Sequence, residues 1–162
     1  MHQHPNVLAV QDALDAAGAR DASGGGCRIV VLPDPAPTAA AAAAQLGVEV
    51  GQIANSLIFD ADGDPLLVLT SGAHRVDTAR VAAALGIAKL RRASPEFVRD
   101  HTGQAIGGVA PVGHPKPVRT LVDAALSAYG EVWAAGGVPH AVFPVTPAEL
   151  ARVTGGEVVD VA

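Results

Sequence analysis

The chain has 162 residues and a net charge of −5; 49% of its residues are hydrophobic, but only 3% are aromatic. This length suits one domain spanning residues 1–162, with a core built mainly from Val, Leu, Ile and Ala. No apolar run is long enough to span a membrane, and the first residues lack the pattern of a signal peptide. The single cysteine, Cys27, excludes an internal disulfide and fits a reducing compartment, so we expect a cytoplasmic protein.

Charge is distributed unevenly along the chain. Between His74 and Arg119 there are eight basic and three acidic residues, a net charge of +5, and the rest of the chain carries −10. One face of an acidic molecule could therefore attract phosphate groups. A solvated basic surface without a partner fits the same pattern equally well.

The first third of the chain predicts two helices and one strand. Residues 5–17 have apolar positions at helical spacing and end near Gly18, and an alanine-rich helix begins after Thr38 and ends at Gly47. Residues 27–32 form a short β-branched run that reads as a buried strand. We expect Cys27, within this strand, to be an inert core residue.

A hairpin follows, in which residues 52–59 and 65–71 flank an Asp- and Gly-rich turn. Asn55 and Ser56 lie inside its first strand, and the second strand ends at Thr70 and Ser71. These small polar side chains are candidates for contacts with a ligand.

His74 and Arg75 come between the hairpin and the next helix. Asp77 is a good N-cap for a helix over residues 78–85, which Gly86 closes. The two residues therefore lie at a strand-to-helix junction, which is a convenient place for a site. An exposed loop without a function is the alternative for each.

Residues 89–93 predict a short strand, and a helix then opens at Ser94-Pro95 and ends before Gly103. Residues 103–115 contain four glycines and two prolines, which excludes a regular helix or an uninterrupted strand. A stiff loop with bare N–H groups at Gly107 and Gly108 could hold a carbonyl, an oxyanion or a phosphate. A tight connection between two strands is the alternative.

The last third predicts strands over residues 118–122, 131–135, 140–145 and 157–161. A helix between the last two opens with a capping box from Thr146 to Glu149. Helices and short strands are mixed with hairpins, which favours an α+β sheet or a partly closed barrel over a doubly wound fold.

Several kinds of chemistry have no motif in this sequence. There is no Walker loop, dinucleotide-binding glycine motif, Cys pair or His-x-x-x-His set, and no Gly-x-Ser-x-Gly elbow. We therefore expect neither a metal nor another cofactor. What remains is a hydrolytic site without a covalent nucleophile, which would use backbone donors, small hydroxyls and histidines that orient water.

The motifs follow one another in a recognisable order. The set comprises Asn-Ser-Leu-Ile-Phe at 55–59, Gly-Ala-His-Arg-Val-Asp at 72–77, Thr102-Gly103, Gly-Gly-Val-Ala-Pro-Val-Gly at 107–113, Leu-Val-Asp at 121–123, Gly136-Gly137 and Pro-Ala-Glu-Leu at 147–150. From about Thr38 to the C-terminus this order resembles the YbaK/ProX family of trans-acting aminoacyl-tRNA deacylases, which is related to the editing domain of bacterial prolyl-tRNA synthetases.

The resemblance implies a mixed α+β domain around a curved, barrel-like sheet flanked by helices. It also implies hydrolysis of the ester in a mischarged tRNA, typically one with Ala or Cys on a proline tRNA. The implied partners are the acceptor end of tRNA and, as a second possibility, an aminoacyl-tRNA synthetase; no membrane is involved.

Two positions depart from the family pattern. The pocket lysine of the family aligns with Asn55, which keeps a hydrogen-bond donor but loses the charge and much of the reach. The small residue before the Gly-Gly pair, often serine, is Ala135. One alternative is therefore a non-catalytic relative that binds tRNA ends, a nucleotide or a synthetase, and another is hydrolysis of a different small ester or amide.

The residues then receive hypothetical roles. Gly107 and Gly108 would stabilise an oxyanion through their amides, Asn55 would contact the ribose or the ester, and His114 or His140 would position water. The expected substrate-binding residues are Ser56, Thr70, Ser71, His74, Arg75, Pro111, Gly113, Asp123, Gly136 and Gly137.

Overall fold

The structure of the protein, a computed structural model, describes residues 4–162. Its strands are β1 (Val30–Val31), β2 (Ile53–Ala61), β3 (Asp64–Ser71), β4 (Leu90–Arg92), β5 (Arg119–Asp123), β6 (Val132–Ala135), β7 (Ala141–Val145) and β8 (Glu157–Val159). Its α-helices are α1 (Pro5–Ala17), α2 (Ala39–Leu46), α3 (Thr78–Leu85), α4 (Pro95–Thr102) and α5 (Pro147–Thr154). Two short 3₁₀ helices, η1 (Val50–Gln52) and η2 (Ala124–Ala128), complete the described part.

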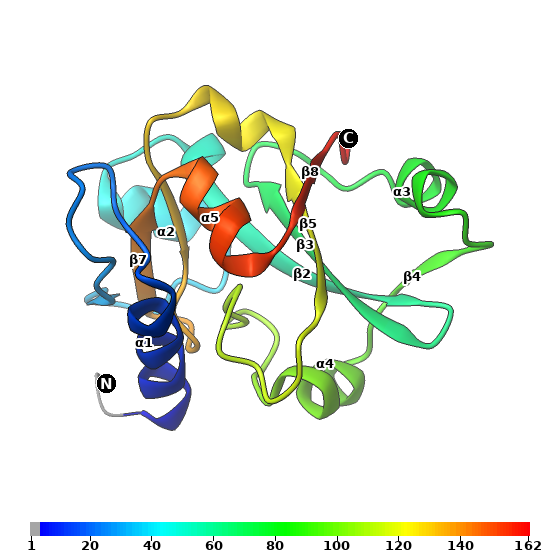
Figure 1. The fold of residues 1–162 in the computed structure, drawn as a ribbon, viewed down its shortest axis with the longest axis horizontal. Coiled ribbons are helices and arrows are strands. Elements are labelled where there is room, and N and C mark those ends of the chain that lie inside the picture. The colour runs from blue at the N-terminus through cyan, green and yellow to red at the C-terminus, as the bar shows by residue number, and fades with distance from the viewer. Residues whose placement is uncertain (1–3) are drawn as a thin grey trace.

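The strands form one mixed sheet in the order β1-β7-β6-β2-β3-β5-β8, and β4 pairs with β2 off this path. The hairpin of β2 and β3 lies at the centre, with a continuous antiparallel register from Ala54–Ser71 to Ala61–Asp64. The pairs β2–β6, β3–β5 and β5–β8 are parallel. The mixed, curved sheet flanked by helices confirms the predicted α+β fold class (Figure 1).

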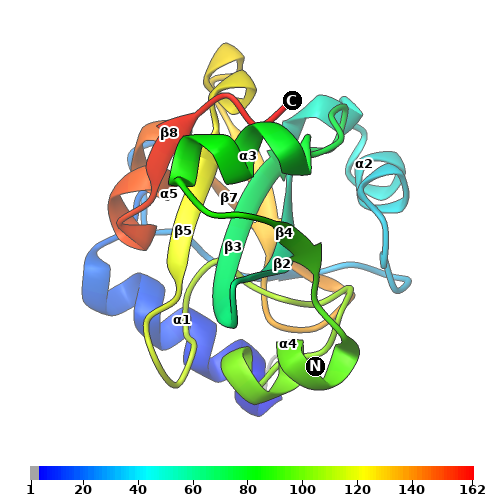
Figure 2. The ribbon, with the colours of Figure 1, turned by 90° about the vertical axis from the view of Figure 1, so that its right-hand side faces the viewer.

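Helices cover both faces of the sheet. The two views place α1 and α5 on one face and α2 on the other, while α3 and α4 lie at the end of the molecule that carries β4 (Figures 1 and 2). The strand β3 is buried on both sides, because Leu67 and Leu69 belong to the core under α1 and α5 whereas Leu66 and Val68 pack with α3. The core is mainly aliphatic, as the composition predicts, with Phe59 and Phe143 as its buried aromatic residues.

The two edges of β2 differ. One edge pairs with β3 along its length. The other pairs with β6 only at Ile53 and Ala54, and with β4 only from Phe59 to Ala61. Residues 55–58 therefore have no strand beside them on that edge, and this opening defines the place of the site.

The helix α1 supports two glycine-containing loops. A Cβ added to Gly113 would lie 3.1 Å from Val10 Cα, and one added to Gly137 would lie 2.9 Å from the Asn6 carbonyl oxygen. Both glycines also have positive φ angles, +85° and +108°. Only glycine fits such a close approach of backbone to helix.

Most predicted elements are present, with some differences. The strand expected over residues 27–32 is reduced to β1, because Cys27 and Leu32 bond to Ala19 and His140 outside any strand ladder. The capping box at the start of α5 is only half formed: the Glu149 carboxylate accepts from Arg152 and from the Arg20 amide instead of from Thr146. The two 3₁₀ helices were not predicted.

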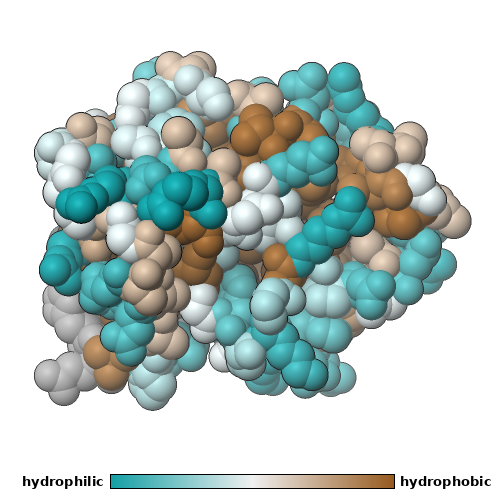
Figure 3. Space-filling model, viewed as in Figure 1, coloured by the Kyte–Doolittle hydropathy of each residue, from teal (hydrophilic) through white to brown (hydrophobic). Residues whose placement is uncertain are grey.

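The molecular surface in the view of Figure 1 is largely polar, with apolar side chains gathered around β8 (Figure 3). Val158 in this strand is 49% exposed. β8 has only three residues, which limits its use as a template for another strand. Within residues 4–162, no helix is long and apolar enough to cross a membrane.

Candidate functional site

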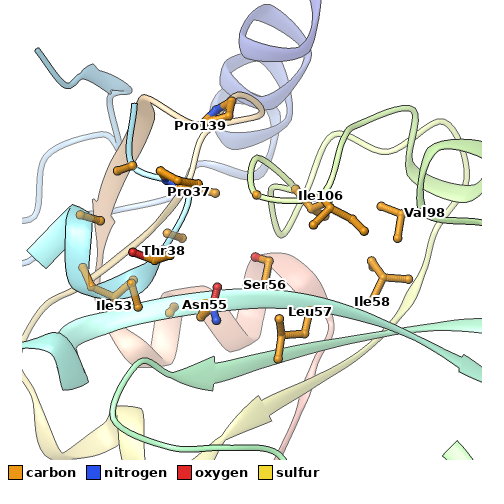
Figure 4. A pocket seen from close by; sticks show the side chains of 18 of the residues that line it. Pro37, Thr38, Ile53, Asn55, Ser56, Leu57, Ile58, Val98, Ile106 and Pro139 are labelled. Carbon is orange, nitrogen blue, oxygen red and sulfur yellow. The ribbon is translucent and has the colours of Figure 1, made fainter. Parts of the chain in front are cut away.

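A cavity of about 580 Å³ lies beside the open edge of β2 (Figure 4). Its walls come from β2, from β6 and from loops that are distant in sequence. The lining includes residues 36–39, 53–59, 74–76, 133–135 and 138–139, together with Arg92, Ile106, Gly107 and Val109. The cavity thus brings together five of the predicted site residues, namely Asn55, Ser56, His74, Arg75 and Gly107.

The charged side chains in the lining are basic. Arg75 and Arg92 line the cavity together with His74, and the lining contains no Asp or Glu. Neither arginine forms an ion pair with another residue of the described part, where the ion pairs involve Arg28, His74 and Arg152. The cavity therefore suits a ligand that is neutral or carries phosphate.

Asn55 and Ser56 enter the cavity from the middle of β2 (Figure 4). The Oγ atom of Ser56 is buried and has no hydrogen-bond partner among residues 4–162. Buried hydroxyl groups are nearly always hydrogen-bonded. The hydroxyl is therefore an unsatisfied polar group within the wall of the cavity.

Gly107 and Gly108 differ in their hydrogen bonding and in what they contact. The Gly108 amide donates to the Ala105 carbonyl oxygen at 3.0 Å and so closes a turn, which corrects the expectation that both amides are available to an oxyanion. Gly107, with φ +90°, lines the cavity, and the hydrogen bonds found within residues 4–162 include none from its amide. A Cβ on Gly108 would lie 2.9 Å from Val138 Cα, so Gly108 is needed for packing.

A buried glutamine fixes this loop. Gln104 is only 2% exposed, and its Oε1 accepts from the Ala110 amide at 2.7 Å. The Thr102 hydroxyl donates to the Val98 carbonyl oxygen and accepts from the Gln104 amide, which anchors the loop to the end of α4. Sequence reasoning missed Gln104, since nothing in its spacing distinguishes it from a solvated loop residue.

His74 is held by a buried carboxylate. Its Nδ1 lies 3.0 Å from Asp123 Oδ2, and Asp123 is 2% exposed at the end of β5. The same carboxylate accepts from the Ser71 and Ala125 amides, both at 2.9 Å, and from the Thr70 hydroxyl at 3.3 Å. Because an ionised carboxylate only accepts, Nδ1 of His74 carries the hydrogen, which leaves Nε2 free to accept on the other side of the ring.

These contacts place Thr70, Ser71 and Asp123 beneath the site. All three are buried, and none of them lines the cavity. Their link to the cavity is His74, which contacts the Asp123 carboxylate and lines the cavity wall. The pairing of His74 with Asp123 was not predicted, since 49 residues separate them.

His114 lies in a different place. With Pro111 and Gly113 it lines a second cavity of about 270 Å³ beside α5, and its Nε2 lies 2.7 Å from the Ala110 carbonyl oxygen. Burial lowers the pKa of His114 below its ordinary value, and the hydrogen bond to Ala110 opposes that shift. The structure thus separates His114 from Asn55 and Gly107.

Gly136, Gly137 and His140 flank the large cavity without lining it. The Gly136 amide donates to the Ala141 carbonyl oxygen at 2.7 Å, and the His140 carbonyl oxygen accepts from the Leu32 amide at 2.7 Å. Between them, Val138 and Pro139 form one wall of the cavity. This loop therefore shapes the wall through its backbone.

Other reactive groups are remote or absent in the described part. Burial, together with nearby acidic groups, raises the pKa of the Cys27 thiol to about 11, so the thiol stays protonated at neutral pH. Residues 4–162 contain no group of three or more His, Cys, Asp or Glu side chains that could hold a metal ion.

These features define a class of protein: an α+β domain with a basic, carboxylate-free cavity at an open strand edge, lined by a glycine whose amide has no partner within residues 4–162. Comparison with known proteins identifies the family. The model of the aminoacyl-tRNA editing domain family matches residues 33–153, and the chain belongs to this family.

Solved structures share the whole fold. A protein described as a candidate trans-editing enzyme for prolyl tRNA synthetase is 44% identical, with a TM-score of 0.87 over 97% of this chain and 96% of that one. The hypothetical protein APE2540 is 31% identical, with a TM-score of 0.83 over 94% of this chain and 98% of that one.

Among curated proteins, the uncharacterized protein YwhH of Bacillus subtilis (strain 168) is 32% identical over 118 residues, which is 72% of this chain and 74% of YwhH. The proline–tRNA ligase of Lysinibacillus sphaericus (strain C3-41) is 31% identical over 97 residues. That match covers 60% of this chain but only 17% of the ligase. The chain is therefore related to one part of a much larger enzyme.

Proposed function

We propose that this protein hydrolyses the ester bond of mischarged aminoacyl-tRNA in trans, with Ala or Cys on tRNA(Pro) as the substrate class. The observation that carries the proposal is the composition of the large cavity. It joins a free backbone amide, Gly107, to the polar side chains of Asn55 and Ser56, and two unpaired arginines lie in the same lining. Membership of the editing-domain family and the relation to proline–tRNA ligase support the same reaction.

Gly107 would stabilise the negative charge that develops on the ester carbonyl oxygen. Its amide has no partner in the described part and lines the cavity. Loss of one such donor typically lowers kcat by about 10²–10³. Asn55 and Ser56 would hold the terminal ribose or the ester, while Gly108 keeps the loop packed against Val138.

His74 would position the attacking water. Its Nδ1 is held by Asp123, so Nε2 can accept a proton as the water oxygen attacks the ester carbon. The C–O bond to the ribose then breaks, and the imidazolium returns the proton to the leaving ribose oxygen. The products are the free amino acid and the uncharged tRNA.

Arg75 and Arg92 would contact phosphates at the acceptor end of the tRNA. Both line the cavity, and neither has a carboxylate partner within residues 4–162. Binding through phosphates weakens as salt rises, because bound counterions are released on association. A synthetase that supplies the charged tRNA would be a second partner.

A non-catalytic role is the alternative, and Asn55 is the observation that favours it. An asparagine lacks the charge of the family lysine and cannot reach as far toward a phosphate or ribose. In this case the cavity would bind tRNA ends without accelerating ester loss.

A deacylation time course distinguishes the deacylase from the non-catalytic tRNA-binding protein. Proline tRNA charged with Ala, Cys or Pro would be incubated with wild type, Asn55→Lys, Gly108→Ala and Gly130→Ala. Gly108→Ala places a Cβ against the Val138 backbone, whereas a Cβ at Gly130 meets nothing within 4 Å, which makes Gly130→Ala a matched control. We expect wild type and Gly130→Ala to hydrolyse the Ala or Cys ester and Gly108→Ala to lose this activity. Acceleration by Asn55→Lys alone would establish the non-catalytic alternative.

A further inference from the structure

The open edge of β2 presents unpaired main-chain groups to the cavity. The Gly72 amide donates to the Ile53 carbonyl oxygen at 2.8 Å. The main-chain groups of Ile53 therefore point toward β3, and this determines the direction of the groups of every other residue in β2. In an antiparallel pair, successive residues direct their N–H and C=O groups to opposite edges. Ile53, Asn55 and Leu57 therefore face β3, and Ser56 and Ile58 face the other edge.

The pairing of β6 and β4 supports this assignment. β6 reaches Ala54, which is two residues before Ser56, and the pairing with β4 begins at Phe59. Since Phe59 itself faces β3, that pairing uses the main-chain groups of Ile58 and Asp60. At Ser56, between these points, no strand pairs with the edge, and the loop hydrogen bonds within residues 4–162 include none to its N–H or C=O. One donor and one acceptor are left at the cavity wall.

Such groups require a partner. Buried backbone N–H and C=O groups are almost always hydrogen-bonded in folded proteins. The side chain of Ser56 adds a buried hydroxyl without a partner at the same place (Figure 4). The N–H and C=O of Ser56 are thus available to a ligand, and the unsatisfied Oγ of the same residue lies beside them.

An aminoacyl ester has the complementary groups. Like one residue of a strand, it carries a donor, the α-amino group, and an acceptor, the carbonyl oxygen. In an antiparallel hydrogen-bonded pair, each residue exchanges both groups with the residue opposite. The cavity lining has no carboxylate to bind an ammonium group, so main-chain carbonyls are the available acceptors.

We propose that the open edge of β2 binds the aminoacyl end of the substrate as a strand would. The Ser56 C=O accepts from the α-amino group, and the Ser56 N–H donates to the ester carbonyl oxygen. This proposal rests on the proposed function and specifies how that site reads its substrate. Recognition of this kind is the same for every amino acid, because it uses only groups common to all of them.

Pairing of the substrate with Ser56 also predicts where the side chain of the substrate's amino acid lies. Residues opposite each other in a pair direct their side chains to the same face, and the neighbours on that face are two residues away. The substrate side chain then lies near Ala54 and Ile58, which are buried and line the cavity. These two residues limit its size.

Deacylation of three substrates by the wild-type protein tests the contact between the Ser56 C=O and the α-amino group. Alanyl-, lactyl- and propionyl-tRNA(Pro) carry an amino group, a hydroxyl group or a hydrogen atom at the α-carbon. For each, the enzymatic rate is divided by the uncatalysed rate, because the amino group itself activates the ester.

We expect the enhancement for propionyl-tRNA to be about 10- to 100-fold lower than for alanyl-tRNA, because a buried acceptor loses its donor. Lactyl-tRNA, which keeps a donor, should lie closer to alanyl-tRNA. Equal enhancement for all three would overturn the proposal while leaving the deacylase function intact. No enhancement for any of them would instead count against that function.

A backbone replacement tests the protein side. In a Ser56→Ala background, the residue at position 56 is replaced by the α-hydroxy analogue of alanine, so that the N–H becomes an ester oxygen. The ester also weakens the Asn55 carbonyl oxygen, which pairs with Thr70 in the ladder, but within residues 4–162 the Ser56 N–H has no partner. We therefore expect only a small decrease in melting temperature and a loss of about 10- to 100-fold in kcat/KM relative to Ser56→Ala. Unfolding of the ester variant would show that this N–H pairs within the protein, and unchanged kcat/KM would show that it does not contact substrate; either would overturn the proposal.

Discussion

The two cavities each contain a histidine that uses one ring nitrogen in a hydrogen bond, but the partners differ. His74 in the large cavity is paired with the Asp123 carboxylate at 3.0 Å, whereas His114 in the small cavity is paired with the Ala110 carbonyl oxygen at 2.7 Å. A carboxylate can stabilise a positive charge on the ring. A carbonyl does so only weakly, and burial disfavours the charged ring of His114.

The comparison favours His74 as the proton acceptor of the proposed reaction. The side chain of His74 is 39% exposed and lines the large cavity together with other candidate residues, and the Asp123 carboxylate beside it would compensate the charge of a proton taken up in the proposed reaction. His114 is enclosed by a proline-rich loop and α1 and is held as a neutral ring. The two histidines thus make hydrogen bonds of similar length, but only His74 has a partner that can balance a positive charge on the ring.

The largest effect is expected from Asp123→Ala. This change leaves the Ser71 and Ala125 amides and the Thr70 hydroxyl without their acceptor. Because each unsatisfied buried group costs about 1–3 kcal/mol, the free energy of unfolding should fall by about 3 kcal/mol or more. Urea unfolding followed by circular dichroism measures this loss, and His74→Gln, which keeps those three bonds, is the control.

His74→Gln and His114→Gln should separate catalysis from structure. We expect His74→Gln to lower kcat for deacylation by about 10²- to 10⁴-fold, because a positioned base is lost, with KM little changed. His114→Gln should leave kcat unchanged, since this residue does not line the large cavity. Equal losses in the two variants would contradict the assignment of the site to the large cavity.

The smallest effect concerns pH. Since the folded pKa of His114 lies below its ordinary value of 6.5, the unfolded chain binds a proton on this ring at a pH at which the folded chain does not. Stability contributed by His114 is therefore present above pH 6.5 and decreases as pH falls through the window below it.

The difference in free energy of unfolding between wild type and His114→Gln measures this contribution. Measured from pH 7.5 to pH 5, it should shift in favour of the variant as the pH decreases. A difference that is independent of pH would mean that His114 is equally protonated in both states.

Much of the fold could be predicted from local signals. The N-caps Thr38, Asp77 and Ser94 and the Asp62-Gly63 turn mark where helices and the central hairpin begin or end, and the structure has them there. These signals act within a few residues, so one sequence is enough to read them. The motif order was likewise sufficient to predict the family.

The site was predicted only in part, because its contacts are long-range. Asn55, Ser56 and Gly107 lie in motifs and meet in the cavity. The link from His74 to Asp123, the function of Gln104 and the separation of His114 depend on how distant strands and loops pack. No periodicity or spacing along the chain carries that information.

The support that α1 gives to the loops of Gly113 and Gly137 has a consequence for how this protein can be divided. The family match covers residues 33–153, and α1 lies before it. Yet Val7, Val10 and Leu14 are buried in the same core as Val109 and Val138. A fragment cut at the family boundary would keep every candidate catalytic residue and uncover the apolar surface beneath two of its loops. The region that the family model matches is thus shorter than the region that shares this core.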